Sequence, residues 1–398
     1  MTVAFATLFL GLVLGPQPVE LVVGADVARV ELFLDGELVG KRTGSPWEIP
    51  CDLGGELAPH ELVAVARNSA GEELGRVRQW INLPTPEAQA AVVVARAGDG
   101  RADVGPELTA VAVEVDGRRR RLGLEALAGR LTVAGRPAVP VGVAKGPAEV
   151  VLVMDRQAQQ GARRIAELWE APETDVSTSV APIDRSIPSL PRPGDLLMRG
   201  GESGAGSQDM RRSRLQTSMR LEEDQLLRFL WPYALEPGEG GVRAALFHRT
   251  RGLPPSYGGM LWLLATVHQP PFSPSDQRLA DAVAAAGMGA AASGRRRAVV
   301  LVVGERPSDV SGLSPPAVRR YLEHLGVPLH VWAVGTVPDE VAEAWGDVRP
   351  VPTKSALRRA VNELSESLER QRIVWVEGLH LPQQVGLSDA AGDLRLVR

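Results

Sequence analysis

The sequence predicts a multidomain protein in which a β-sandwich precedes a doubly wound, mostly parallel α/β domain with helices on both sheet faces. Two Val-rich apolar runs indicate the α/β part: AEVVLVMD at Ala148–Asp155 and RRRAVVLVVGE at Arg295–Glu305. Continuous runs of this kind suit parallel strands that are buried on both faces. Before residue 84, short alternating strands separated by tight turns are typical of a sandwich.

Composition places the chain among ordinary globular proteins. It has 398 residues, 44% hydrophobic and 23% charged, with a formal net charge of −4, so we expect no nucleic-acid partner. Its single cysteine, Cys51, excludes an intramolecular disulfide and a cysteine-built zinc site, and we expect it to be a small buried hydrophobe. The basic clusters at 118–121 and 295–297 are interpreted as solvated strand ends or turns.

The N-terminal segment MTVAFATLFLGLVLG is apolar but too short to span a bilayer. It has the apolar core of a signal peptide but neither a basic start nor a clear cleavage site. We interpret residues 1–16 as a candidate signal peptide and expect export to the periplasm or the cell exterior, with a cytoplasmic location as the alternative. A mis-set start codon or a first buried strand would also account for this segment. No further segment is a candidate for an integral membrane helix.

Residues 17–83 are predicted to form an immunoglobulin-like β-sandwich. Asp35-Gly36 between two alternating segments favours a tight hairpin turn, and Asn68–Gly71 predicts another. Leu83-Pro84-Thr85-Pro86 cannot continue a sheet, so residues 84–146 are assigned to a linker with additional β elements.

From residue 147 strands alternate with helices, which predicts a parallel sheet. We assign 147–372 to this α/β domain, with an irregular Pro- and Gly-rich insertion at 171–206, and 373–398 to a β-like C-terminal tail. The expected helices are Gln160–Trp169, Arg212–Leu230, Ser275–Ala292, Ser314–Leu325 and Lys354–Arg370, and the expected strands are Ala148–Met154, Val242–Phe247, Ala298–Val303, Pro328–Val334 and Ile373–Val376.

These elements carry a resemblance to a known family. The order of VVLVMD, RLADAVAAAGMGAAASGRRRAVVLVVGE and PPAVRRYLEHLGVPLHVWAVG resembles a von Willebrand factor type A domain. It is most similar to a divergent branch of bacterial secreted proteins in which an immunoglobulin-like β-domain comes first. The resemblance covers about residues 150–368, with the β-domain adding the first 83, and residues 279–335 are its most specific part.

The resemblance implies a metal-ion-dependent adhesion site above the carboxyl ends of the strands. The family uses D-x-S-x-S after the first strand, a threonine before a middle helix and an aspartate that ends the fourth strand. Mg2+ requires a near-octahedral shell of oxygen ligands, and most of those residues are replaced in this chain. We therefore expect a degenerate site without Mg2+ or another cofactor, at the matching positions Asp155, Gln157, Gln159, Gln277 and Val303.

The function that follows is non-enzymatic, because the sequence has no nucleophile elbow, phosphate loop or zinc-binding histidine pair. The leading hypothesis is an exported binding or scaffold protein that recognises an unidentified protein partner through the type A-like domain or the sandwich. The alternative is a metal-dependent adhesion or assembly module that uses Asp155 with Glu305 or Asp309 from the next loop. A hydrolase built on residues 171–206 is a third hypothesis.

Overall fold

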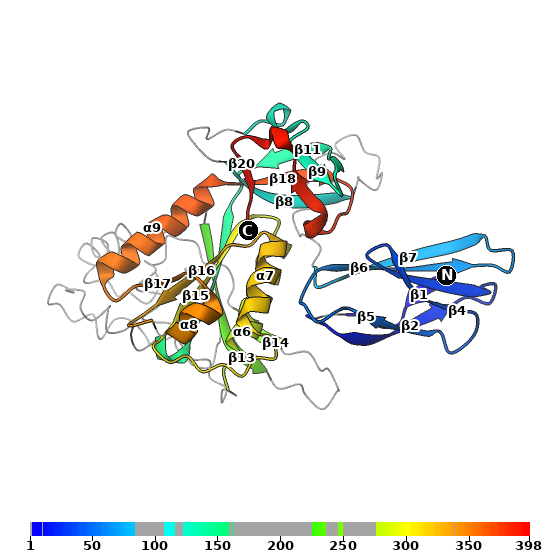
Figure 1. Cartoon of the computed structure of the whole chain (residues 1–398), viewed down its shortest axis with the longest axis horizontal. Helices are drawn as coiled ribbons and strands as arrows, with labels where there is room; N and C mark the ends of the chain where they lie inside the picture. The colour runs from blue at the N-terminus through cyan, green and yellow to red at the C-terminus, as the bar shows by residue number, and fades with distance from the viewer. Residues whose placement is uncertain are drawn as a thin grey trace, which may run out of the picture.

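The computed structural model describes residues 2–9, 11–83, 107–115, 122–158, 161, 225–235, 246–249, 276–337 and 339–398. Figure 1 shows three units: a sandwich of the N-terminal strands, an α/β domain, and a second β unit that includes the C-terminal strands. The predicted fold class, an all-β domain followed by an α/β domain with a mostly parallel sheet, is confirmed.

The sandwich packs two antiparallel sheets, ordered β1-β2-β5 and β4-β3-β6-β7, around one core. Val19, Ile49 and Leu62 are at most 2% exposed there, because alternate side chains of each strand face inward. Cys51 is 1% exposed in the same core, as expected for a buried thiol. The strands are β1 (Val3–Phe5), β2 (Pro16–Val23), β3 (Arg29–Leu34), β4 (Glu37–Arg42), β5 (Glu48–Asp52), β6 (His60–Arg67) and β7 (Glu73–Ile81).

The apolar N-terminal segment is part of this sandwich. β1 pairs antiparallel with β2, with Val3 opposite Val23. Val3 is 9% exposed, and Phe5, Phe9 and Val13 pack against the core. In the structure, residues 3–5 thus form a first strand with Val3 buried, which agrees with one of the alternatives for this segment.

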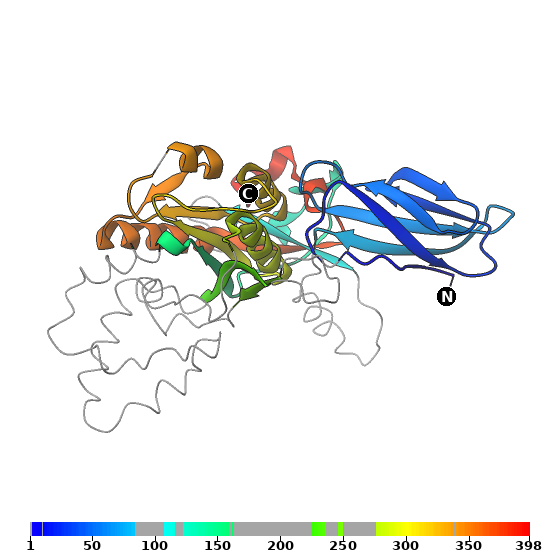
Figure 2. The same ribbon diagram turned by 90° about the horizontal axis from the view of Figure 1, so that it is seen from below.

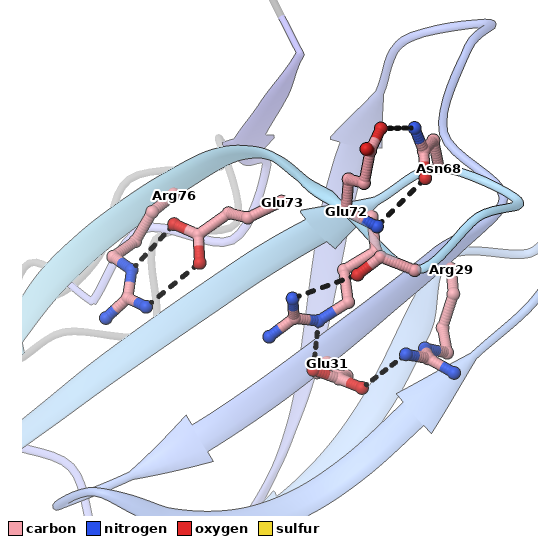
Figure 3. Close-up of polar contacts among 8 residues, drawn as sticks. Arg29, Glu31, Asn68, Glu72, Glu73 and Arg76 are labelled. Carbon is pink, nitrogen blue, oxygen red and sulfur yellow. Dashed lines mark hydrogen bonds and ion pairs between the residues drawn. The ribbon is translucent and has the colours of Figure 1, made fainter.

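Both predicted hairpin turns of the sandwich are present. Asp35 and Gly36 have φ values of 52° and 89°, and this left-handed pair lets β3 turn tightly into β4. At the β6–β7 turn, Oδ1 of Asn68 accepts a hydrogen bond from the backbone nitrogen of Glu72 at 2.9 Å. Figure 3 shows this turn beside Glu31, which forms ion pairs with arginines of β3 and β6 on the outer face of the sheet.

The α/β domain is built on a sheet ordered β14-β13-β12-β15-β16-β17, in which all strands except β14 are parallel. The central strands β12 and β15 are buried along their whole length, which explains their continuous apolar sequences. Helix α9 covers one face, while α6, α7 and α8 cover the other (Figures 1 and 2). The elements are β12 (Ala148–Met154), β13 (Gln225–Leu235), β14 (Leu246–Arg249), α6 (Leu279–Ala292), β15 (Arg296–Val303), α7 (Pro315–Leu325), β16 (Leu329–Ala333), α8 (Asp339–Trp345), β17 (Val348–Pro350) and α9 (Lys354–Arg370).

The second β unit combines strands from both sides of the α/β domain. Its larger sheet has the order β11-β18-β8-β20, and its smaller sheet has the order β10-β9-β19. The segments 84–146 and 373–398, which were assigned separately from the sequence, therefore pair with each other. The strands are β8 (Leu108–Val115), β9 (Leu131–Val133), β10 (Arg136–Pro137), β11 (Pro140–Ala144), β18 (Gln371–Glu377), β19 (Val385–Leu387) and β20 (Leu394–Leu396).

Two arginines at the start of β15 join the α/β domain to this unit. Arg296 and Arg297 are 0% and 3% exposed, so the interpretation of this cluster as a solvated strand end is wrong for both. Arg296 donates to the carbonyl oxygens of Gly146 at 2.8 Å and of Leu368 at 2.9 Å. The backbone of Arg297 exchanges two hydrogen bonds with the side-chain amide of Gln371. Peptide and amide groups thus replace water around these cations.

One helix prediction is wrong in its described part. Residues 225–230 were expected to end a helix but belong to β13, whose alternate residues Leu227, Phe229 and Trp231 lie in one core. Consecutive apolar residues there fit both the helical and the strand period, so the pattern alone could not decide. The rest of that helix, the helix predicted from residue 160 except for residue 161, and the insertion at 171–206 lie outside the described residues.

Candidate functional site

The candidate site lies at the edge of the parallel sheet where β12 and β15 end and α6 begins. Parallel strands bring their carboxyl ends to one edge, which is where open α/β sheets bind ligands. This arrangement places Asp155 beside Gln277, although they are 122 residues apart in the sequence. Gly304, directly after β15, lies against the same carboxylate.

The carboxylate of Asp155 is buried and satisfied by the protein itself. Asp155 is 0% exposed. Its Oδ1 accepts a hydrogen bond from Nε2 of Gln277 at 2.9 Å, and its Oδ2 accepts one from the backbone nitrogen of Gly304 at 3.1 Å. Both oxygens therefore face N–H donors.

The side chain of Gln277 connects three parts of the site. Its Nε2 also lies 2.9 Å from Oγ of Ser308, and its Oε1 accepts from the backbone nitrogen of Arg156 at 2.7 Å. A carboxylate can only accept and a backbone N–H can only donate, so both neighbours require the same orientation of the amide. Gln277, which is 4% exposed, thus fills the site as a structural crosslink.

The other matched positions lie apart from this carboxylate or on its margin. Gln157 is exposed, and its Oε1 accepts from the backbone nitrogen of Arg306 at 3.1 Å. Val303 is 0% exposed and belongs to the core beneath α6 and α7. Gln159 lies outside the described residues. The structure therefore brings together Asp155 and Gln277 of the matched set, with Gln157 holding the adjacent loop.

The two carboxylates from the loop after β15 have other contacts. Asp309 accepts hydrogen bonds from the backbone nitrogens of Leu279 at 2.9 Å and Ala280 at 3.2 Å. It thereby caps α6, whose own preceding residue supplies no side-chain cap, and places negative charge at the positive end of the helix. Glu305 is exposed and accepts from Oγ1 of Thr336 at 3.3 Å.

These residues do not fit a divalent cation. Mg2+ needs about six oxygen ligands at short range. Around Asp155 the structure has an amide nitrogen and a backbone nitrogen, and both donate to the oxygens that a metal would need. Across the described ranges, no group of three or more His, Cys, Asp or Glu residues could hold a metal ion.

Burial raises the pKa of nearby Tyr233 against the opposing effect of Arg156, which keeps its phenol protonated at neutral pH.

Comparisons with known proteins give structural likenesses of low score. No family model and no curated protein matches the chain. Proximal thread matrix protein 1 from the mussel byssus aligns in two structures, one of them with a zinc-occupied MIDAS motif. They share 10% and 11% identity with TM-scores of 0.28 and 0.29, and cover 58% and 62% of this chain. The chain spans about half the length of that protein, 48% and 50%. A set of fibronectin(III)-like modules of Clostridium thermocellum CbhA aligns at 16% identity and a TM-score of 0.19, covering 20% of this chain and 93% of the module.

Sequence reasoning missed three participants in the site: Ser308, the backbone nitrogen of Gly304, and the capping role of Asp309. Each acts on a partner about 30 or more positions away along the chain. No local pattern marks such contacts. The lack of a side chain at Gly304 is what lets the carboxylate of Asp155 approach its backbone.

Proposed function

We propose that this chain is a non-enzymatic binding or scaffold protein whose type A-like domain recognises a protein partner without a metal ion. The observation that supports it best is the buried contact between Asp155 and Gln277. A carboxylate that is already satisfied by two N–H groups has little free energy to gain from a cation, since those hydrogen bonds would first have to break.

The loop after β15 supports a role in protein recognition. Its backbone is held at several points: Arg306 donates to Gln157, and Val310 donates to the carbonyl oxygen of Gln277 at 2.8 Å. The side chain of Val310 is nevertheless 52% exposed. A loop that is ordered before binding loses little conformational entropy when a partner docks, which favours affinity. The opposite edge of the sheet is joined to the second β unit by Arg297, whose backbone is hydrogen-bonded to the side chain of Gln371 in β18, so we assign the partner to the carboxyl edge.

The experiment begins with covalent capture of partners from the native host, followed by a binding measurement with the purified pair. Val310→Asp should weaken binding at least tenfold, because it places a charge in an apolar contact. Val39→Asp, at an exposed position of the sandwich that is 38% accessible, is the matched control and should bind like the wild type. Equal binding by both variants would remove the carboxyl edge from the proposal.

The metal-dependent alternative is less well supported, because Asp309 is used as a helix cap and Glu305 contacts Thr336. Isothermal titration of the wild-type protein with Mg2+ and Mn2+ separates the two functions. We expect no saturable heat. Saturable binding tighter than about millimolar that is lost in Asp155→Ala would instead establish the metal-dependent module.

Export is a separate part of the proposal, supported by the apolar N-terminal run. Because residues 3–5 form β1 of the sandwich, cleavage of residues 1–16 would remove that strand, so the N-terminus of the recovered protein distinguishes a signal peptide from a first strand. Mass spectrometry of the N-terminus of protein recovered from the host fractions tests both points. Among the helices in the described part of the chain, none has the length and apolar character needed to cross a membrane.

A further inference from the structure

A cavity of about 400 Å³ lies where the three structural units meet. Trp80 of the sandwich, Leu325 at the end of α7 and Leu108 of β8 line it. Two hydrogen bonds between units lie near it. Oη of Tyr321 donates to the carbonyl oxygen of Asn82 at 2.7 Å, and Nε2 of Gln383 donates to that of Pro59 at 2.7 Å. The cavity is thus part of an ordered junction between units.

One wall of the cavity is the apolar face of β8. Leu108, Ala110 and Ala112 share this face because alternate residues of a strand point to the same side, and all three line the cavity. Val113 points the other way, into the core of the second β unit, and Val111 belongs to that core while also lining the cavity. The two alanines leave the volume open where larger side chains would fill it.

A buried cation also lines the cavity. Arg297 is 3% exposed, and its guanidinium donates to the carbonyl oxygens of Gly326 at 3.0 Å, Ala291 at 3.3 Å and Leu325 at 2.9 Å. A guanidinium has five N–H groups, so these three hydrogen bonds leave some of its N–H groups available to a ligand. No carboxylate among the described residues forms an ion pair with it. Burial lowers the pKa of Arg297 to about 10, so it stays charged at neutral pH.

The remaining charges at the cavity do not neutralise this cation. Arg320 and Glu323 also line it, and both are exposed. Arg320 lies 3.3 Å from Glu56, a pair of exposed side chains that water screens strongly. Arg398 lines the cavity as well and adds a further positive charge. A ligand with one negative charge would therefore improve the local balance.

We propose that this cavity binds an organic anion with an aliphatic body, in which the carboxylate faces Arg297 and the hydrocarbon chain lies along β8. A concave site with mostly apolar walls and one fixed polar group is the usual design for such ligands. Charge-assisted contacts between a guanidinium and a carboxylate are strong where water is excluded. Because all three units form the walls, a bound ligand would stabilise their docked arrangement by mass action.

Decanoate is the probe, titrated calorimetrically into the full-length protein below its micelle concentration. We expect saturable one-to-one binding and a rise in the unfolding midpoint. Two comparison ligands separate the contributions: decanol lacks the negative charge, and acetate lacks the hydrocarbon chain. Decanol should bind about tenfold more weakly than decanoate, the ratio expected when one charge-assisted contact is lost, and acetate at least about a hundredfold more weakly, because it lacks eight methylene groups.

Two variants assign the binding to this cavity. Ala110→Phe fills the space beside β8 while keeping the Arg297 side chain and should abolish decanoate binding, whereas Val139→Phe, at a position that is 57% exposed, is the control and should bind normally. If Ala110→Phe does not fold, Trp80→Ala removes a wall from the sandwich side and should weaken binding. No saturable decanoate binding by the wild type, equal affinity for decanol, or unchanged binding by the cavity variants would overturn the assignment.

Discussion

Nε2 of Gln277 lies 2.9 Å from Oδ1 of Asp155, and this contact joins the end of β12 to the start of α6. The amide oxygen of Gln277 also accepts from the backbone nitrogen of Arg156, the residue after Asp155. A single side chain therefore makes two hydrogen bonds to one short loop. In open α/β sheets ligands bind at this edge, and in this chain the space there is crosslinked by an amide.

Removal of the Asp155 carboxylate should lower the stability of the protein. Asp155→Ala leaves the buried donors of Gln277 and Gly304 without that acceptor, which should lower the free energy of unfolding by about 1–3 kcal/mol. Asp276→Ala removes an exposed carboxylate next to Gln277 and is the matched control, expected to change stability little. Urea denaturation measures both. A chelator should shift neither midpoint, and a chelator-dependent midpoint in the wild type alone would contradict a site without metal.

Gly304 allows the loops that follow β12 and β15 to approach each other closely. A Cβ at this position would lie 2.6 Å from Cβ of Gln157 and 3.1 Å from Oδ2 of Asp155. Gly304→Ala must displace one of the two loops and should cost roughly 1–3 kcal/mol, as overpacking does elsewhere. Gly312→Ala lies in the same loop with no atom within 4 Å of the new Cβ and should be neutral. Similar unfolding midpoints for the two variants would show that the loops yield easily.

The N-terminal strand should be necessary for a stable sandwich. Val3→Asp introduces a charge at a core position that is 9% exposed, and we expect a loss of at least about 2 kcal/mol of unfolding free energy. Val22→Asp places the same charge on the neighbouring strand, where the side chain is 56% exposed, and should cost far less. Calorimetric unfolding of the two variants makes the comparison. Equal stabilities would mean that β1 contributes nothing to folding.

The partly buried imidazole of His330 should make stability depend on pH. Its Nε2 is buried without a hydrogen-bond partner in the described part of the chain, and burial lowers the pKa of His330 to about 4. The unfolded chain binds this proton from about pH 6.5 downward, so it holds more protons than the folded chain between pH 6.5 and 4. The unfolding free energy should therefore fall as pH falls through that window, by roughly 3 kcal/mol for this group.

Chemical denaturation of the wild type and of His330→Leu at several pH values isolates this contribution from that of the carboxylates. The variant should lose less stability than the wild type between pH 6.5 and 4. Parallel curves for the two proteins would show that His330 is accessible to protons in the folded state.

Much of the architecture follows from local pattern. The runs at β12 and β15 predicted buried parallel strands, Asp35-Gly36 predicted its hairpin, and the helix predicted to start near Ser314 begins at Pro315 with Ser314 as its N-cap. These elements could be predicted because side-chain periodicity, turn conformation and capping act within a few residues of each other. The candidate edge of the sheet followed as well, since Asp155 comes directly after the first run.

Tertiary structure alone decided the rest. Whether Arg296 is solvated or buried depends on carbonyl oxygens at Gly146 and Leu368, which lie 150 and 72 residues away. The apolar pattern of residues 225–230 fits both the helical and the strand period. Pairing with β12 in the sheet decides that they form a strand. The state of Asp155 depended on which donors the fold brings to it. The partners of a hydrogen bond and the burial of a side chain depend on which groups lie close in space. A local sequence pattern therefore cannot specify them.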